Sequence, residues 1–398
     1  MPYWTGAKIL DNSYESKKVR YFKELCKEPE EERFVTEYSP IKLRKNLANL
    51  NHLLIEITDK CNLSCKYCGY GDMYGNYDKR ENKNNTFQNI KTLIDFLYKS
   101  WSSNDNLSFN NIRYIGFYGG EPLVNFSLIK ETIDYLEALS ELSELKFEYG
   151  MTTNGMLLHK YMEYIADKKI HLLISLDGNE YNDSYRVMKN GQPSFSQVIS
   201  NVETLRKKYP QYFEQYVNFN AVLHNRNSVK DIIFYIKNKF NKFPTISSLA
   251  TNGIKKEKQK EFIKMFQNQL ESYKEAESCF DTQKMFLQTP DSAMANFFIN
   301  AYCNQTFRKY SDLFIYDSDK EYIPTGICMP LKRKLFLTVN GKLLACERIG
   351  QTYPLGKIVG GQVFMDFEGI SAFYKKLFDR NIHFYISKFY FLLLQSYF

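Results

Sequence analysis

Cys61, Cys65 and Cys68 lie in the run CNLSCKYC, so one short loop carries three thiols. With this spacing their sulfur atoms can converge on one metal centre. An iron–sulfur cluster of the 4Fe-4S type usually takes four thiolates. Three would leave one iron open to a substrate or cofactor, much as catalytic zinc keeps an open position. The spacing therefore predicts a metal centre that does chemistry.

The same spacing allows two other interpretations. The three thiols and one distant ligand could form a closed zinc site, in which case the protein would have a structural or regulatory role. The three cysteines could also be unrelated residues of one loop. Analysis of bound iron and sulfide separates a cluster from zinc.

Gly119, Gly120 and Glu121 form a second candidate, directly ahead of a proline. Two glycines let the backbone approach a ligand closely, and the carboxylate can bind an ammonium group. The alternative is a tight turn that leads into a helix, with Glu and Pro in its first turn.

Further polar residues follow two later apolar runs. Asn154 precedes a glycine and could belong to an ordinary turn. Ser175 and Asp177 are two residues apart and share one side of an extended strand, where they could meet ribose hydroxyls. Arg186 follows a short way on. The Asp-Gly pair at 177–178 could again be only a turn.

The elements that must position these residues are short β-rich runs that alternate with longer amphipathic helical patterns. This alternation implies an α/β fold with parallel strands. Loops at the carboxyl ends of such strands converge on one face, so one site explains candidates that follow four successive strands. Strands are predicted at 53–58, 113–118, 146–152, 171–176, 216–223 and 245–250, and helices at 86–100, 127–139, 160–168, 195–208 and 228–240.

The cysteine run resembles the signature of the radical S-adenosylmethionine (SAM) superfamily, CxxxCxxC with an aromatic residue, here Tyr67, before the third cysteine. The resemblance implies that Cys61, Cys65 and Cys68 bind a 4Fe-4S cluster that cleaves SAM. It covers about residues 50 to 250 and implies a partial (β/α)6 TIM-like barrel. The lateral opening of such a barrel admits a large substrate, which suits peptides and proteins.

The same resemblance assigns SAM contacts to the other candidates. Gly119, Gly120 and Glu121 look like the glycine–glycine–glutamate motif that receives the methionine amine of SAM. Asn154 would lie in the third-strand motif of the family, Ser175 would meet the SAM ribose, and Arg186 would lie near the SAM carboxylate or ribose.

Cys328 and Cys346 fit a second family pattern, in which Gly341 follows the first cysteine after 12 residues and the second cysteine follows after four more. This resembles the start of a SPASM domain, which carries auxiliary iron–sulfur clusters. No cysteine follows Cys346, and the composition turns aromatic and apolar from about residue 381. We therefore expect a small, incomplete SPASM-like region, cut short by premature termination or an altered reading frame.

The remaining cysteines have less defined roles. Cys279 and Cys303 could complete one auxiliary cluster with the SPASM-like pair, but buried free thiols or remnants are the expectation. Cys26 is expected to be structural. Along the chain we expect an N-terminal extension at 1–50, the radical SAM partial barrel at 51–252, a helical linker region at 253–327 and the truncated SPASM-like region at 328–398.

Composition and charge indicate which partners and which location to expect. The net charge of +8 is modest for 398 residues and is not gathered into one stripe, so no nucleic-acid partner is expected. No stretch reaches the roughly 20 apolar residues of a membrane span, and residues 1–10 lack the pattern of a signal or transit peptide. We expect a cytoplasmic location, where cysteines serve metal binding or catalysis rather than disulfides.

The resemblance implies an enzyme that reductively cleaves SAM to a 5′-deoxyadenosyl radical and modifies a ribosomally made peptide or protein side chain, as a peptide maturase does. A protein oxidase of the anaerobic sulfatase-maturing type is the second interpretation. The implied partners are a precursor peptide or protein and an electron donor such as flavodoxin or ferredoxin. The cofactor supplies the reactive species and the barrel positions it.

One further alternative is an RNA-modifying radical SAM enzyme. The basic balance and the 31 Tyr and 31 Phe residues suggest it, because aromatic rings can stack on bases. Strongly salt-dependent RNA binding would favour this alternative. The second cysteine pattern argues against it and for work on peptides.

Overall fold

The computed structural model describes residues 39–106, 111–277, 279 and 330–376. They belong to one compact unit of the chain, which comprises residues 38–294 and 328–376. Cys26, Cys303 and Cys328 lie outside the described residues.

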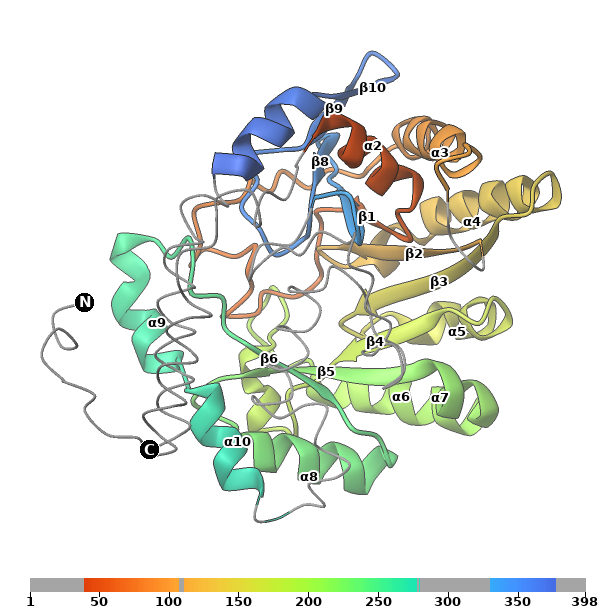
Figure 1. Cartoon of the computed structure of the whole chain (residues 1–398). Coiled ribbons are helices and arrows are strands. Elements are labelled where there is room, and N and C mark those ends of the chain that lie inside the picture. The colour runs from red at the N-terminus through yellow and green to blue at the C-terminus, as the bar shows by residue number, and fades with distance from the viewer. Residues whose placement is uncertain (1–38, 107–110, 278, 280–329, 377–398) are drawn as a thin grey trace, which may run out of the picture. The chain divides into compact units, whose positions relative to one another are not determined.

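Six parallel strands form the centre of the sheet, and all six were predicted. They are hydrogen-bonded to one another in chain order. Parallel neighbours need a crossover connection, and each crossover contains a helix (Figure 1). The strands are β1 His52–Thr58, β2 Ile112–Gly119, β3 Lys146–Thr153, β4 His171–Ser175, β5 Val217–Leu223 and β6 Thr245–Ser248.

β1 is buried along nearly its whole length, from Leu53 to Thr58. A strand that is covered on both faces reads as a continuous apolar run, which is why Leu-Leu-Ile marks this strand in the sequence. Glu56 interrupts the run. Its carboxylate is paired with Arg80 and accepts a hydrogen bond from the Val339 N–H, so the buried charge is compensated.

A C-terminal segment extends the sheet to ten strands. β7 pairs in parallel with β1, with Leu335 opposite Leu53, and the three strands after it are antiparallel. The sequence did not predict this extension, because strands of three or four residues are too short to show a periodic pattern. The strands are β7 Lys334–Leu337, β8 Lys342–Leu344, β9 Gly356–Val359 and β10 Gln362–Met365.

The five predicted helices are present, each within three residues of its expected start. α3 begins where the Thr86 hydroxyl accepts a hydrogen bond from the Asn89 N–H, and α8 begins where Ser228 caps Asp231 in the same way. Such caps satisfy backbone donors that have no partner within the helix. The predicted helices are α3 Phe87–Trp101, α4 Phe126–Glu141, α5 Leu158–Asp167, α6 Phe195–Lys208 and α8 Val229–Phe240.

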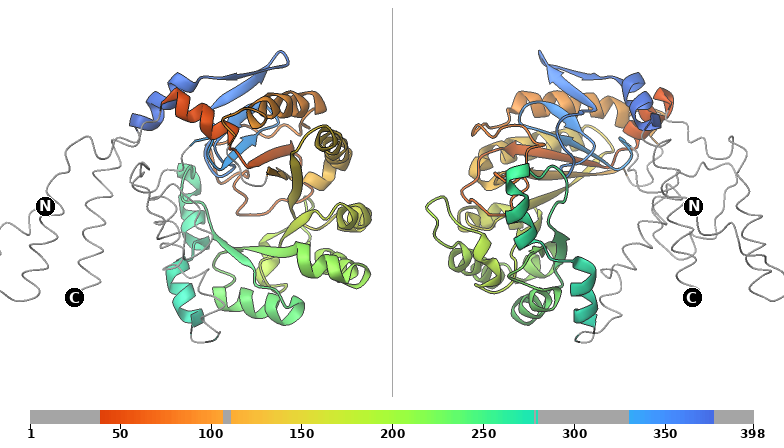
Figure 2. Two further views of the ribbon diagram at one scale, coloured as in Figure 1. Left: turned by 45° about the vertical axis from the view of Figure 1, so that its right-hand side comes forward. Right: turned by 90° about the vertical axis from the view of Figure 1, so that its left-hand side faces the viewer.

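Shorter helices complete the described chain. α2 packs against α3 through buried Leu43 and Leu47. α3 also contacts the hairpin of β9 and β10, which is drawn in blue at the top of Figure 2. No helix in the described part of the chain is long and apolar enough to cross a membrane. These helices are α2 Pro40–Ala48, α7 Pro210–Tyr216, α9 Gln259–Met265 and α10 Gln269–Glu277, with 3-10 turns η2 Pro122–Asn125, η3 Asn182–Tyr185 and η4 Lys256–Lys258.

Candidate functional site

The three predicted metal ligands lie in the loop that directly follows β1. Cys61, Cys65 and Cys68 are half-buried and form no disulfide. Burial raises the pKa of the Cys61 thiol to about 11, and it also raises the pKa of Cys65. The charges of the neighbouring cysteines act in the same direction on both thiols. The three thiols are therefore near enough to influence one another, as ligands of one cluster must be.

A 4Fe-4S cluster fits this donor set. Within the described ranges, no three His, Cys, Asp or Glu side chains surround a position for a single metal ion. A cluster takes its thiolates on different iron atoms, so its cysteines stand further apart than the ligands of one ion. Three thiolates are soft donors of the kind that iron–sulfur clusters use.

Gly119 and Gly120 bring the end of β2 against the residues ahead of the cysteine loop. The Gly120 N–H donates to the Thr58 carbonyl at 2.8 Å, and the Glu121 N–H donates to the Lys60 carbonyl at 2.7 Å. A Cβ atom on Gly120 would lie 2.1 Å from the Lys60 carbonyl oxygen. Glu121 also caps η2. The run is therefore a turn into a 3-10 helix, and Gly120 approaches the backbone of Asp59 and Lys60 closely. The approach of these glycines to a ligand stays a prediction.

Glu121 and Asn154 meet beside Cys61. The Glu121 carboxylate is buried and accepts hydrogen bonds from the Thr153 hydroxyl and the Asn154 N–H, both at 2.7 Å. Burial raises its pKa to about 7 despite these donors. The Asn154 side-chain amide donates to the Asn62 side chain at 2.7 Å and lies 3.8 Å from the Cys61 sulfur. The second and third predicted motifs therefore converge on the cysteine loop.

Arg186 also lies beside the cysteine loop, whereas Ser175 stands half-buried at the end of β4. The Arg186 Nε is 3.2 Å from Asp177 Oδ2 and 3.6 Å from Asp183 Oδ1. Its guanidinium carbon lies 5.5 Å from the centre of the Tyr67 ring. Arg186 is thus held beside the cysteine loop by two buried carboxylates.

Asp177 does not face outward for a ribose, as its spacing from Ser175 had suggested. Its side chain is completely buried. Oδ1 accepts from the Val222 N–H at 2.8 Å, and Oδ2 accepts from the Tyr67 hydroxyl and from Arg186. Both carboxylate oxygens accept hydrogen bonds from the protein, so the described contacts of Asp177 position other parts of the chain.

His224 belongs to the site although no motif pointed to it. It follows β5 and is completely buried. Its ring centre lies 5.5 Å from that of Tyr67 and 4.8 Å from that of Tyr185. The rule that functional groups follow the carboxyl ends of parallel strands could have identified it, because His224 directly follows Leu223, the last residue of β5.

The second cysteine pattern is described only in part. Cys346 is half-buried after β8, burial raises its pKa to about 11, and its sulfur lies 3.2 Å from Glu347 Oε2. Glu347 pairs in turn with Lys334 at 3.0 Å. Cys279 is exposed after α10, so the expectation of a buried thiol there was wrong.

Residues 70–78, which follow the third cysteine, are bonded to two distant parts of the chain. On the β6 side, the Gly75 N–H donates to the Gly253 carbonyl at 2.8 Å and Lys255 pairs with Asp72 at 3.0 Å. On the β8 side, the Gln351 N–H donates to the Asn76 carbonyl at 2.9 Å. This connecting segment is therefore bonded both to the residues after β6 and to those after Cys346.

The side chains of the connecting segment add aromatic packing. Met73 and Tyr74 form a buried cluster with Tyr67 of the cysteine loop and with Phe262 and Met265 of α9. The cluster joins the cysteine loop to a helix that follows β6, so packing as well as hydrogen bonding holds the loop in place.

The sequence profile of the radical SAM superfamily matches residues 55–237. The matched residues include the carboxyl-terminal part of β1, the cysteine loop, and Glu121, Asn154, Arg186 and His224. Residues 55–237 of the chain therefore form a region that is similar to the radical SAM superfamily.

Curated relatives also match part of the chain. The chain is 35% identical over 158 residues to an uncharacterized protein of Methanocaldococcus jannaschii, covering 39% of this chain and 49% of the relative. It is 28% identical over 221 residues to the radical SAM cyclopropyl synthase TigE of Paramaledivibacter caminithermalis, covering 53% and 42%. It is 27% identical over 170 residues to a cysteine-type anaerobic sulfatase-maturating enzyme of Clostridium novyi, covering 42% and 43%. The chain thus spans less than half the length of these relatives.

A solved structure has the same fold. The anSMEcpe structure with bound AdoMet and Cp18Cys peptide superposes with a TM-score of 0.50 at 19% identity, over 77% of this chain and 76% of that chain. The parallel α/β architecture predicted from the sequence is therefore that of the radical SAM TIM-like barrels.

Proposed function

We propose that the protein cleaves SAM reductively at a 4Fe-4S cluster held by Cys61, Cys65 and Cys68, and uses the resulting 5′-deoxyadenosyl radical to modify a ribosomally made peptide or protein side chain. The observation that carries the proposal is the convergence of Glu121 and Asn154 on the cysteine loop. A buried carboxylate and an amide beside an open metal position form a receptor for the amine and carboxylate of an amino acid such as the methionine of SAM.

The protein residues would bind and orient SAM. Glu121 would accept hydrogen bonds from the ammonium group, since an ionised carboxylate makes strong bonds to such a cation. Arg186 would face the carboxylate or ribose. Gly119 and Gly120 would let the backbone come close to the ligand, because neither carries a side chain. Excluding water and holding the reacting atoms in place are the protein's contribution to the rate.

A peptide or protein is the proposed substrate class. The relatives support it by name, since one matures sulfatases, and the structural neighbour holds a peptide. The names of these relatives suggest two kinds of reaction. One is the formation of a cyclopropyl group, as in the name of TigE, and the other is the oxidation of a Cys or Ser side chain. We propose the peptide maturase first, because the match to TigE covers more of the chain.

The deciding experiment measures 5′-deoxyadenosine formed by protein reconstituted without oxygen with iron and sulfide, then given SAM and a strong reductant. The parent should form it, and a variant with Cys61, Cys65 and Cys68 replaced by Ala should not. Cys279→Ala is the matched control and should behave like the parent. A parent that holds iron and sulfide but forms no 5′-deoxyadenosine would contradict the proposal, and bound zinc in its place would favour a structural role.

Two parts of the proposal need their own measurements. Cys328 and Cys346 are proposed as ligands of an auxiliary cluster, so Cys346→Ala should lower the iron bound per chain while Cys279→Ala should not. A cytoplasmic location with flavodoxin or ferredoxin as electron donor is proposed as well. Replacing the chemical reductant by reduced flavodoxin or ferredoxin should still support 5′-deoxyadenosine formation.

A further inference from the structure

Asp177 is the common acceptor for groups from three different parts of the chain. It accepts hydrogen bonds from the Tyr67 hydroxyl of the cysteine loop, from Arg186 of the segment after η3, and from the Val222 N–H of β5. Burial opposes ionisation of this carboxyl, but Arg186 and His224 hold its pKa below the usual value. A buried carboxylate is stable only with such partners, so its position and theirs determine one another.

The bond from Tyr67 acts on the middle of the cysteine loop. Tyr67 stands between Cys65 and Cys68, so its hydrogen bond to Asp177 anchors the part of the loop that carries both thiols. The same loop is bonded through its backbone to the segment that contains Arg186. The Ser64 N–H donates to the Val187 carbonyl at 2.7 Å, and the Lys66 N–H donates to the Tyr185 carbonyl at 3.0 Å.

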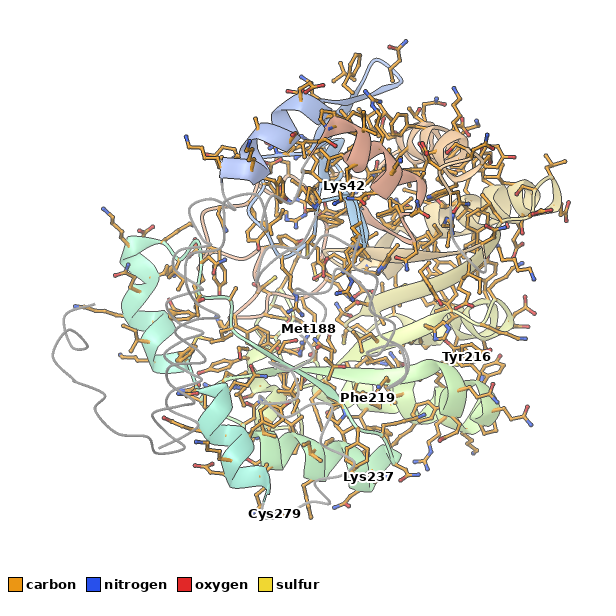
Figure 3. All side chains as sticks on the ribbon, viewed as in Figure 1. Lys42, Met188, Tyr216, Phe219, Lys237 and Cys279 are labelled. Carbon is orange, nitrogen blue, oxygen red and sulfur yellow. The ribbon has the colours of Figure 1, made fainter. Side chains whose placement is uncertain are left out.

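This segment after η3 runs along the loop for several residues. Leu63 forms a β-bridge with Met188, which is labelled near the middle of Figure 3. The cysteine loop and the Arg186 segment therefore form one layer. Asp177 is the side chain that bonds to both parts of this layer at once.

His224 supports Asp177 from the β5 side. The Arg226 N–H donates to His224 Nδ1 at 3.2 Å, which makes Nδ1 the acceptor and leaves the proton of a neutral ring on Nε2. Nε2 lies 3.6 Å from Asp177 Oδ2. The ring also packs against Tyr67, so His224 touches both partners of the Tyr67–Asp177 bond.

We propose that Asp177, supported by His224, is a positioning residue that holds Tyr67 and Arg186 so that the three thiols and the SAM-binding arginine keep one relative geometry. This rests on the proposed function. If Asp177 had a purely structural role, its substitution would lower stability alone. If it has a positioning role, its substitution must also change how SAM binds at the cluster.

The test uses protein reconstituted with iron and sulfide and compares the parent with Asp177→Asn and Tyr67→Phe. In Asp177→Asn, an uncharged amide replaces the carboxylate, so one of the two acceptor oxygens is lost. Arg186 then no longer has its charged partner and is free to move. Tyr67→Phe removes only the hydroxyl and keeps the buried ring. Glu56→Gln is the matched control, because Glu56 is another buried carboxylate paired with an arginine, and its described partners are Arg80 and the Val339 N–H rather than Tyr67 or Arg186.

Three quantities are measured: the dissociation constant for SAM, the change that SAM causes in the electron paramagnetic resonance spectrum of the reduced cluster, and the melting temperature of the metal-free protein. Asp177→Asn should raise the dissociation constant about tenfold or more, the effect of losing one charged hydrogen bond, and alter the SAM-induced spectral change. Tyr67→Phe should alter the spectral change with a smaller loss of affinity. Glu56→Gln should lower only the melting temperature.

Parental affinity and spectra in both Asp177→Asn and Tyr67→Phe would overturn the inference, whatever happens to their melting temperatures. If Asp177→Asn does not fold, Tyr67→Phe decides alone, and a parental spectrum in that variant overturns it. Failure of the proposed function looks different, because the parent itself would then bind no cluster or show no spectral response to SAM.

Discussion

The hydroxyl of Tyr67 donates a hydrogen bond to the carboxylate of Asp177, 110 positions further along the chain. Tyr67 follows β1 and Asp177 follows β4, and two strands lie between β1 and β4 in the sheet. The bond therefore crosses the carboxyl end of the parallel strands, and it connects the cysteine loop to a charged cluster that the loop's own sequence does not reveal.

Gly120→Ala should prevent the close approach of β2 to the cysteine loop. The new Cβ atom would lie 2.1 Å from the Lys60 carbonyl oxygen and 2.7 Å from that of Asp59. We expect the free energy of unfolding of the metal-free protein to fall by about 2 kcal/mol, as overpacking does, and less iron to be retained. Urea unfolding and iron analysis measure both. Gly69→Ala, with nothing within 4 Å of its Cβ, should change neither, and an equal loss there would refute the explanation.

Asn154→Ala should keep the cluster but impair SAM cleavage. The variant retains all three thiols and loses the amide that contacts Asn62 and the Cys61 sulfur. We expect parental iron and sulfide content with 5′-deoxyadenosine formation lowered about tenfold, the effect of one lost hydrogen bond near a charged group. Asn190→Ala, at an exposed turn, is the control. Parental activity in Asn154→Ala would remove this residue from the site.

The pH dependence of stability should report Glu121. Burial raises the pKa of this carboxyl from 4.5 to about 7, so the folded state holds the proton more tightly than the unfolded chain. The resulting stabilisation is fully present below the unfolded pKa and is lost as the pH rises through about 7, at up to about 1.4 kcal/mol per pH unit.

Between about pH 5 and pH 7, the free energy of unfolding of the metal-free parent should therefore change with pH differently from that of Glu121→Gln, which cannot titrate. The parent should lose more stability over this interval than the variant. Urea unfolding at several pH values gives both curves. Parallel curves would mean that Glu121 does not have a raised pKa in the folded protein.

Gly253→Ala should separate the connecting segment from the residues after β6. Gly253 has a φ of +75°, and a Cβ atom there would lie 2.2 Å from the side chain of Asn76. Gly360 has a φ of +57° with nothing within 4 Å, so Gly360→Ala carries the backbone cost alone, about 1 kcal/mol. Gly253→Ala should lose about 2 kcal/mol more than this control in urea unfolding. Equal losses would show that the contact with Asn76 does not matter.

The sequence anticipated most of the fold because its signals are local. Each predicted strand is a short β-rich run, and each predicted helix has an amphipathic pattern, so local patterns located them. β7 to β10 were not predicted in this way. β7 forms only because the edge of β1 is available for Leu335 and its neighbours, and a pairing over such a distance leaves no pattern in a four-residue run.

The residues of the candidate site were likewise predicted only in part. The spacing of Cys61, Cys65 and Cys68, and the glycines ahead of Glu121, are chemical patterns that can be read from neighbouring residues. Asp177 was singled out for the wrong partner, and His224 was not singled out at all. Their roles depend on which strand ends lie side by side, and the pairing of the strands in the sheet decides that.

The sequence by itself indicated the resemblance to the radical SAM superfamily, because the spacing of the three cysteines and the glycine–glycine–glutamate run can be read from neighbouring residues. Only the tertiary structure decided which buried charges support the cysteine loop. Asp177, Arg186 and His224 come from separate segments, and a charge taken out of water is stable only where partners from elsewhere in the fold surround it.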